Sequence, residues 1–328
     1  LLNKTFKFKV KNIKFVKNGI ILSLPGLISV CISLISIPIH LKIAGAENYG
    51  NYIIFHFLLT ISTILNFGIG KSIVISMNNF PIKIKTIAFQ GIKYTFLICL
   101  IIATILIFLF LKNEFLFNYF FQSNIITYYF IICVVCTILY LSLEGILQGY
   151  EKYKHISFFN FIFFSLSLSL PSLILLFEND LTLERLILVA TSLKIICILT
   201  MLFLIKLNNF IERSNSNILI TNLKKNCKWL TLNSILVQFY DIFDKYLLKI
   251  FFGPIALATY SIPQQLTGKL SIFSKGFSAV LLAILSKKKV SYYNFNKTIK
   301  IFLIVIPSLI LLIFPAYHSF LNFWLGED

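Results

Sequence analysis

Apolar and polar positions along this chain are patterned on the scale of a lipid bilayer. Long, mostly apolar runs alternate with short polar segments, and about 20 helical residues are enough to cross ~30 Å of hydrocarbon. We therefore expect an all-α, polytopic membrane protein. Nine spans are predicted, at about Gly19–Ile43, Asn51–Met77, Thr86–Leu111, Ile125–Gly149, Ser157–Phe177, Leu186–Ile205, Trp229–Phe252, Ile255–Ser286 and Thr298–Ala316.

The polar segments carry the charges that orient these helices. Lysines fill the N-terminal segment and every second connection after it, whereas the remaining connections are neutral or acidic. Basic loops tend to stay in the cytoplasm, so the N-terminus is predicted to be cytoplasmic. The net charge of +18 is thereby explained by lysines that lie against the anionic inner leaflet of the membrane. We therefore expect no nucleic-acid partner.

Two similar turns divide the predicted spans into two groups. LKIAGAENYGNYI follows the first span and LKIFFGPIALATYSI follows the seventh. The two turns are six spans apart, so both groups of spans start on the same side of the membrane, as in a parallel repeat. We predict a basic cytoplasmic N-terminus (1–18), a six-helix membrane bundle (19–205), a basic cytoplasmic linker (206–228) and a C-terminal membrane bundle (229–328).

Composition and motifs exclude several classes of function. Hydrophobic residues make up 58% of the chain and charged residues 13%, far from the usual soluble range. The longest polar connection, 206–228, leaves no room for a catalytic domain, so we do not expect an enzyme. Cys133 and Cys136 lie in the middle of a span, the histidines share no metal spacing, and there is no Gly-rich phosphate loop. We therefore expect no cofactor and no metal.

Four segments, taken in order, resemble bacterial polysaccharide flippases. ISLISIPIHLKIAGAENYGNYIIFHFLLTISTILNFGIGKS resembles their opening, and LEGILQGYEKYKHISFFNFIFF resembles their fourth-to-fifth helix junction. DKYLLKIFFGPIALATYSIPQQL resembles their seventh-to-eighth hairpin, and WLGED the loop after their ninth helix. These proteins are O-antigen and repeat-unit transporters of the multidrug/oligosaccharidyl-lipid/polysaccharide exporter superfamily.

The resemblance implies a flippase for undecaprenyl-diphosphate-linked oligosaccharide in the bacterial cytoplasmic (inner) membrane, serving assembly of surface glycans such as lipopolysaccharide. The polysaccharide polymerase and chain-length machinery are the implied protein partners. Such flippases typically have twelve or more helices, so the C-terminal bundle of three predicted helices is expected to be incomplete. Asp244 stands at the family's usual acidic position. Asn66 replaces an aspartate that many relatives carry, so no acidic role transfers there.

Several lysines are predicted to lie inside the hydrocarbon layer. Each would cost about 2.5–3.5 kcal/mol there, so we expect them to face an interior cavity. Lys194 lies in the sixth span, and Lys269 and Lys275 lie in the eighth, where Gln264 continues a polar stripe; Lys71 belongs to a similar stripe on the second. A cationic cavity suits a diphosphate cargo. The alternative is that some lysines, Lys71 among them, snorkel to the interface or pair structurally.

Acidic residues in the seventh span have two interpretations. Asp241 and Lys245 are four residues apart on one helical face, so they could form a structural ion pair. Alternatively, Asp241 is a protonatable group that couples transport to an ion gradient, with Asp244 and Glu144 as further candidates.

The competing functions are a multidrug exporter or a peptidoglycan-precursor flippase of the same superfamily, a membrane glycan polymerase or ligase, and a purely structural membrane subunit. A polymerase or ligase usually needs a sizeable outer loop with arginines or acids, and the outer loops here are short.

Overall fold

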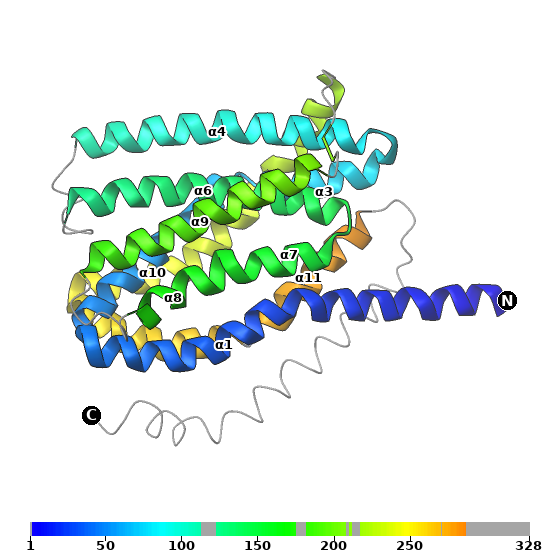
Figure 1. The fold of residues 1–328 in the computed structure, drawn as a ribbon. Coiled ribbons are helices and arrows are strands. Elements are labelled where there is room, and N and C mark those ends of the chain that lie inside the picture. Colours follow the sequence, from blue (N-terminus) through cyan, green and yellow to red (C-terminus); the bar gives the residue numbers. More distant parts are fainter. Residues whose placement is uncertain are drawn as a thin grey trace.

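A computed structural model shows the chain as a bundle of helices that lie roughly along one direction (Figure 1). All elements within the described stretches are helical, which confirms the predicted all-α fold. The backbone is described for residues 2–112, 123–174, 182–207, 210–211, 217–269 and 271–286. Side chains are described over the same stretches except 2–16, 61, 217–226, 238–242, 262–263, 265–269, 271–275 and 284–285. The predicted ninth span lies outside the described residues.

The first predicted span and the start of the second share one kinked helix, α1 (Leu2–Leu58), which turns at Gly45. Gly45 has φ 81° and ψ 163°, a backbone conformation that is essentially restricted to glycine. Pro25 and Pro38 lie inside the first arm of α1, where a proline nitrogen cannot donate to the preceding turn. The several-residue turn that we predicted after the first span is therefore a break at one glycine.

The second predicted span is interrupted, which the sequence reading did not foresee. After α1 come the short helix α2 (Ile61–Leu65) and then α3 (Ile69–Asn79). Between them Phe67 and Gly68 have positive φ angles of 51° and 66°. The prediction of one continuous helix was wrong here because the apolar pattern runs straight through the break.

The buried Asn66 amide compensates for this break. Its Nδ2 donates to the carbonyl oxygen of Ile138 (3.0 Å) and to Ser142 Oγ (3.1 Å), both on α6 (Asn124–Gly149). Its Oδ1 accepts from the Gly70 N–H at 3.3 Å. Backbone groups in a bilayer must find partners within the protein, and Asn66 supplies some of them.

Helices α3, α4 (Ile84–Lys112) and α9 (Leu183–Leu207) all pack on α6, and the turn η1 (Pro81–Lys83) joins α3 to α4. Gly70 allows the close approach of α3, because a Cβ there would collide with the backbone of α6. The third, fourth and sixth predicted spans match α4, α6 and α9 to within a few residues.

The fifth predicted span contains a change of helix type. It consists of α7 (Tyr153–Asn160), the π-helical turn η2 (Phe161–Leu166) and α8 (Ser167–Ile174), which contains Pro171. A proline can kink a membrane helix, and serine hydroxyls can donate back to carbonyl oxygens of the preceding turn. The wide turn begins ten residues before Pro171, and Ser169 Oγ does donate to the Ser165 carbonyl oxygen at 2.7 Å.

Tyr52 belongs to the hairpin that α1 forms around Gly45, here called the first hairpin, and donates to carbonyl oxygens of α8 close to Pro171. The Tyr52 hydroxyl donates to the carbonyl oxygen of Leu168 at 2.8 Å and lies 3.4 Å from that of Ser167. Ser167 is four residues before Pro171, where the missing N–H would have donated. Tyr52 therefore ties α1 to α8 at the point where α8 is weakest.

The next hairpin repeats the geometry of the first. Helix α10 (Asn217–Lys269) turns at Gly253, whose φ of 81° and ψ of −177° nearly equal those of Gly45. Helix α11 (Ser271–Leu285) continues the returning arm. Because α10 begins at Asn217, the second half of the predicted linker is helical.

Equivalent positions of the two hairpins are 208 residues apart. The pairs are Gly45 and Gly253, Tyr52 and Tyr260, Gly68 and Gly276, and Asn78 and Ser286.

Contacts between the hairpins follow this equivalence. Asn78 Nδ2 donates to Ser286 Oγ at 2.6 Å, as expected for equivalent residues close to a two-fold axis. Gly276 lies against Gly19 of α1, and Gly68 lies against Leu230 of α10. The helices are thus related as in a parallel repeat, and the division at the linker 206–228 stays a prediction.

Five stretches of the described residues are long and apolar enough to cross a membrane. They are Lys17–Asn79, Pro81–Lys112, Asn124–Gly149, Tyr153–Ile174 and Leu183–Leu207. The first of these contains the whole first hairpin, and therefore two of the predicted spans.

Candidate functional site

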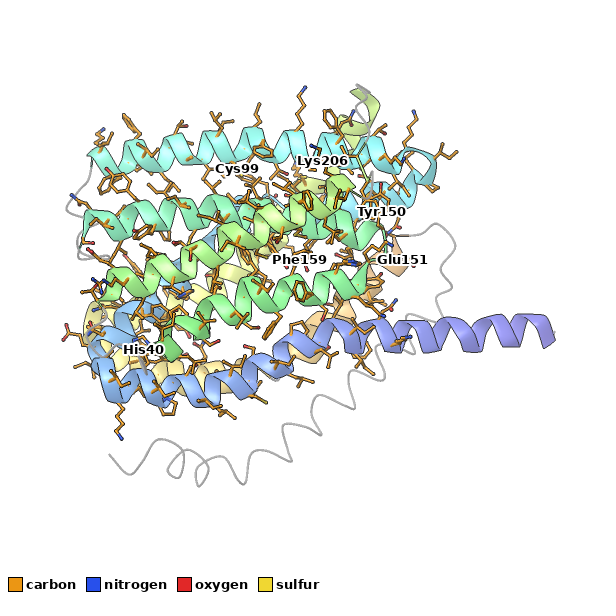
Figure 2. The ribbon with its side chains drawn as sticks, viewed as in Figure 1. His40, Cys99, Tyr150, Glu151, Phe159 and Lys206 are labelled. Carbon is orange, nitrogen blue, oxygen red and sulfur yellow. The ribbon has the colours of Figure 1, made fainter. Side chains whose placement is uncertain are left out.

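A line of buried polar rings runs through the first hairpin. His40 Nδ1 lies 2.8 Å from Ser172 Oγ on α8, and the His40 ring lies 5.2 Å from that of Tyr52. The Tyr52 ring in turn lies 4.6 Å from that of His56. Figure 2 places His40 at the end of the bundle opposite the turn between α6 and α7. The Gly45 turn brings His40 and His56 onto facing arms.

Both histidines have a ring nitrogen without a partner. The Nε2 atoms of His40 and His56 are buried and have no hydrogen-bond partner among the described residues. A buried polar atom without a partner is costly and marks a group that could bind or move a proton. The spacing of the histidines along the sequence did not single out either of them. Their arrangement depends on the Gly45 turn, which brings His40 on one arm against Tyr52 on the other, with His56 on the far side of the Tyr52 ring.

Lys194 lies at the inner end of this line. It is 4% exposed in the middle of α9, and its Nζ lies 5.4 Å from the centroid of the Phe163 ring of η2. His56, Cys133 and Cys136 lie within its electrostatic reach. None of the described carboxylates pairs with Lys194. The expectation that Lys194 faces the protein interior agrees with this placement.

A small pocket lies between α1 and the η2–α8 segment. Its volume of about 20 Å³ holds roughly one water molecule. Serine side chains from both walls line it, together with Tyr49 and Tyr52: Ser29, Ser33, Ser36, Ser165, Ser169 and Ser172. A pocket of this size can relay a proton or hold a water, and it is too small for a sugar.

Glu144 belongs to a second polar group on α6. The Asn160 amide donates to Glu144 Oε1 at 3.3 Å, and the Tyr140 hydroxyl donates to Asn160 Oδ1 at 2.7 Å. Lys71 of α3 is exposed and within electrostatic reach of the carboxylate. The structure therefore brings together two predicted site residues, Glu144 and Lys71, on neighbouring helices.

Asp244 is tied across the second turn. Its Oδ2 accepts from the Tyr260 hydroxyl and from Gln264 Nε2, the latter at 3.4 Å. Its Oδ1 accepts from the backbone N–H of Lys245 at 2.8 Å. Asp244 and Gln264 were assigned by sequence to ion coupling and to the substrate path respectively, and the Gly253 turn makes them neighbours.

Lys245 connects the second hairpin to the first. Its Nζ lies 4.6 Å from the centroid of the Phe57 ring on α1, within the range of a cation–π interaction. The side chains of Asp241, Lys269 and Lys275 lie outside the described residues, so their predicted roles stay predictions.

The two hairpins touch at both ends. Near the turns, a Cβ on Gly50 would collide with the carbonyl oxygen of Pro254. At the opposite end, Asn78 Nδ2 donates to the Ala283 carbonyl oxygen at 3.0 Å. The Gln148 amide of α6, outside both hairpins, also donates to a carbonyl oxygen of α11, that of Ala279. In this conformation the hairpins are closed against each other at these points.

Over the described residues, no cluster of three or more His, Cys, Asp or Glu side chains could hold a metal ion.

Comparison with known proteins identifies a family and several solved structures that are similar to this chain. A family model described as polysaccharide biosynthesis protein matches residues 15–289, and no curated protein matches the chain. A solved structure described as an outward-facing multidrug resistance MATE family transporter of the MOP superfamily is similar at a TM-score of 0.60 and 12% identity. The similarity covers 83% of this chain and 65% of that one.

A MATE structure in complex with Br-NRF is similar at a TM-score of 0.59 and 13% identity, over 83% of this chain and 67% of that one. At such identities the likeness shows a shared fold. This chain spans slightly less than two thirds of the length of the MATE transporter described as outward-facing.

Proposed function

Because the chain belongs to the polysaccharide biosynthesis protein family, we propose that it moves undecaprenyl-diphosphate-linked oligosaccharide units across the bacterial cytoplasmic membrane. The cargo passes from the inner to the outer leaflet and supplies surface glycans such as O-antigen. The proposal places the N-terminus in the cytoplasm. It names the polysaccharide polymerase and chain-length machinery as downstream partners and assigns no covalent step to this chain.

The burial of Lys194 without an acidic partner among the described residues is the observation that carries the proposal. An ammonium group enclosed among α6, α9 and η2 is expensive unless an anion approaches it. A diphosphate is such an anion, and its charge is offset as it passes the bundle. A cationic cargo would meet repulsion at the same point.

Other predicted residues extend this route in the proposal. Lys71 and Gln264 lie on the second and eighth predicted spans, and Lys269 and Lys275 follow Gln264 in the chain. We assign all four to the path of the diphosphate and the glycan. Hydroxyl and amide groups along such a path can exchange hydrogen bonds with sugar hydroxyls.

Ion coupling is assigned to the carboxylates. Asp244 lies among Tyr260, Gln264 and the Lys245 backbone, and its protonation would release the Tyr260 and Gln264 contacts. Asp241 and Glu144 are the further candidates, and Lys245 is the cationic group four residues after Asp241 that could pair with it. A coupled proton would therefore act on the second turn, where the two hairpins touch.

A multidrug exporter is the second candidate, and the fold shared with MATE transporters favours it. A peptidoglycan-precursor flippase fits the same fold. The charge of the interior separates the multidrug exporter from both flippases, since a polyprenyl diphosphate is anionic and many drugs are cationic.

The test is translocation in reconstituted vesicles. Lys194→Met keeps the volume and removes the charge, and we expect glycolipid translocation to slow by about tenfold or more. Lys194→Arg should retain part of the rate, and Lys93→Met, at an exposed lysine of α4, should leave it unchanged. Unchanged translocation in Lys194→Met would overturn the proposal, as would export of a cationic dye by vesicles that do not move the glycolipid.

A further inference from the structure

An apolar groove runs along the outside of the bundle between α7, η2 and α9. Its volume is about 450 Å³, within the ~300–1,000 Å³ typical of small-molecule sites. Nine side chains line it: Phe158, Phe159, Ile162, Ile196, Cys197, Thr200, Phe203, Leu204 and Leu207. The polar group of Thr200 is already used, because its hydroxyl donates to the carbonyl oxygens of the preceding turn of α9.

The groove is open to the bilayer and deepest near Cys197. Phe158 and Phe203 are 60% and 64% exposed, whereas Cys197 is buried. The Cys197 thiol contacts the Phe159 carbonyl oxygen at 3.8 Å, next to the π-helical turn. The wide turn η2 and the small side chain of Cys197 leave a hollow where two regular helices with larger side chains would close.

One end of the groove is basic. Leu207 and Phe158 line this end, and Lys206 is next to Leu207 on α9. Lys154 and His155 lie one turn before Phe158 on α7, and all three basic side chains are exposed. This is the end that the charge pattern places in the cytoplasm.

The turn between α6 and α7 holds this end in place. Figure 2 shows Tyr150 and Glu151 of the turn at the same end of the bundle as Lys206. The Tyr150 hydroxyl donates to the Phe210 carbonyl oxygen at 2.8 Å, and the Tyr150 ring stacks on that of Phe210. Burial raises the pKa of Tyr150 to about 12, so the phenol keeps the proton that it donates. Lys152 Nζ lies 5.9 Å from the Phe210 ring centroid, which leaves Lys154, His155 and Lys206 to meet a ligand.

We propose that this groove binds one acyl chain of an anionic phospholipid from the cytoplasmic leaflet, with the lipid phosphate against Lys154, His155 and Lys206. The apolar lining matches the chain, and the basic end matches the phosphate. The site lies on the outer surface of α7 and α9, so it is distinct from the interior route through Lys194 and does not depend on the cargo. A lipid held there would fix α9 against α7 while the hairpins move.

Lipid retention by the purified full chain tests the proposal. Native mass spectrometry of the protein titrated with phosphatidylglycerol or phosphatidylcholine of equal chain length should show about tenfold stronger retention of phosphatidylglycerol. The double variant Lys154→Gln and Lys206→Gln should lower phosphatidylglycerol retention to the phosphatidylcholine level. Thr200→Phe fills the groove and should remove retention of both lipids. Ile196→Trp narrows the groove from an exposed position and repeats the test should Thr200→Phe fail to fold.

Matched variants elsewhere should change nothing. Lys83→Gln removes an exposed basic charge on η1 at the same end of the bundle, and Leu100→Phe enlarges an exposed side chain on α4. Equal retention of the two lipids by the wild type would overturn the proposal. So would unchanged retention in the groove variants, an equal loss in the two controls, or retention of undecaprenyl phosphate without phosphatidylglycerol.

Discussion

The hairpins at Gly45 and Gly253 turn in nearly the same way, yet their equivalent tyrosines have different partners. Tyr52 donates to backbone carbonyl oxygens of α8 next to Pro171. Tyr260, seven residues after its own turn as Tyr52 is, donates to the Asp244 carboxylate. The repeat therefore preserves the turn and the position of the hydroxyl, while the partner of that hydroxyl differs between the halves.

The difference divides the candidate chemistry. The first hairpin buries imidazole rings beside Tyr52, with His40 and His56 each leaving a ring nitrogen unpaired among the described residues. The second hairpin holds a carboxylate under Tyr260, which the proposal makes the ion-coupled group. A common backbone can thus carry imidazole rings beside the tyrosine in one half and a carboxylate beside it in the other.

Replacement of the turn glycines should have the largest effect. Gly45→Ala and Gly253→Ala each place a Cβ on a backbone with φ of 81°, where strain is on the order of 1–3 kcal/mol. Neither glycine has another atom within 4 Å of the added Cβ, so strain alone should act, and the two losses should be equal. Thermal unfolding of the detergent-solubilised protein measures both.

Ala46→Ser is the matched control, because it changes the adjacent position without altering the turn. If one glycine variant loses much more stability than the other, the two turns are not equivalent. Stability equal to the wild type in both would show that the backbone is not held in this conformation.

Removal of the hydroxyl from the two equivalent tyrosines should lower the stability of the protein by different amounts. Tyr52→Phe leaves carbonyl oxygens of α8 without a donor in a membrane interior, and should cost about 1–2 kcal/mol. Tyr260→Phe should cost less, about 0.5 kcal/mol, because Asp244 keeps the Gln264 amide and the Lys245 N–H. Unfolding of the two variants under identical conditions gives the comparison.

Tyr52→Phe combined with Pro171→Ala provides the control. Alanine restores a backbone N–H to α8, so the loss caused by Tyr52→Phe should shrink in that background. A loss of the same size with and without Pro171 would mean that Tyr52 contributes through its ring packing instead.

Much of this fold could be predicted because bilayer-length apolar runs leave few alternatives to helices. The breaks within the spans could not. Phe67 takes a positive φ between Asn66 and Gly68 in a mostly apolar stretch, and Asn66 finds its partners on α6, 72 residues or more away in the chain. The π-helical turn η2 contains no glycine or proline that would have signalled it.

The burial of Lys194 could be predicted from the cost of a charge in the hydrocarbon, whereas its surroundings could not. Helices that are apolar all round do not reveal which face meets which neighbour, so Phe163 and His56 could not be assigned to Lys194. The Asp244 and Gln264 contact could not be predicted either, because it depends on the Gly253 turn folding two arms together.

The smallest expected effect concerns the contact between the hairpins. Lys245 Nζ lies over the Phe57 ring, and a cation–π interaction of this kind is worth about 0.5–1 kcal/mol at a partly exposed site. Since Lys245 has further interactions, the single variant Lys245→Met reports more than this contact. A double-mutant cycle with Phe57→Leu isolates it.

We expect a coupling energy of about 0.5–1 kcal/mol between Lys245→Met and Phe57→Leu in the closed conformation. The same cycle with Phe55→Leu is the control, because Phe55 is also buried in α1 and its ring lies against those of His56 and Phe130. If the losses of stability in the Phe57 cycle are additive, Lys245 and Phe57 do not interact in the closed conformation. Coupling that disappears when substrate is added would show that the contact opens during transport.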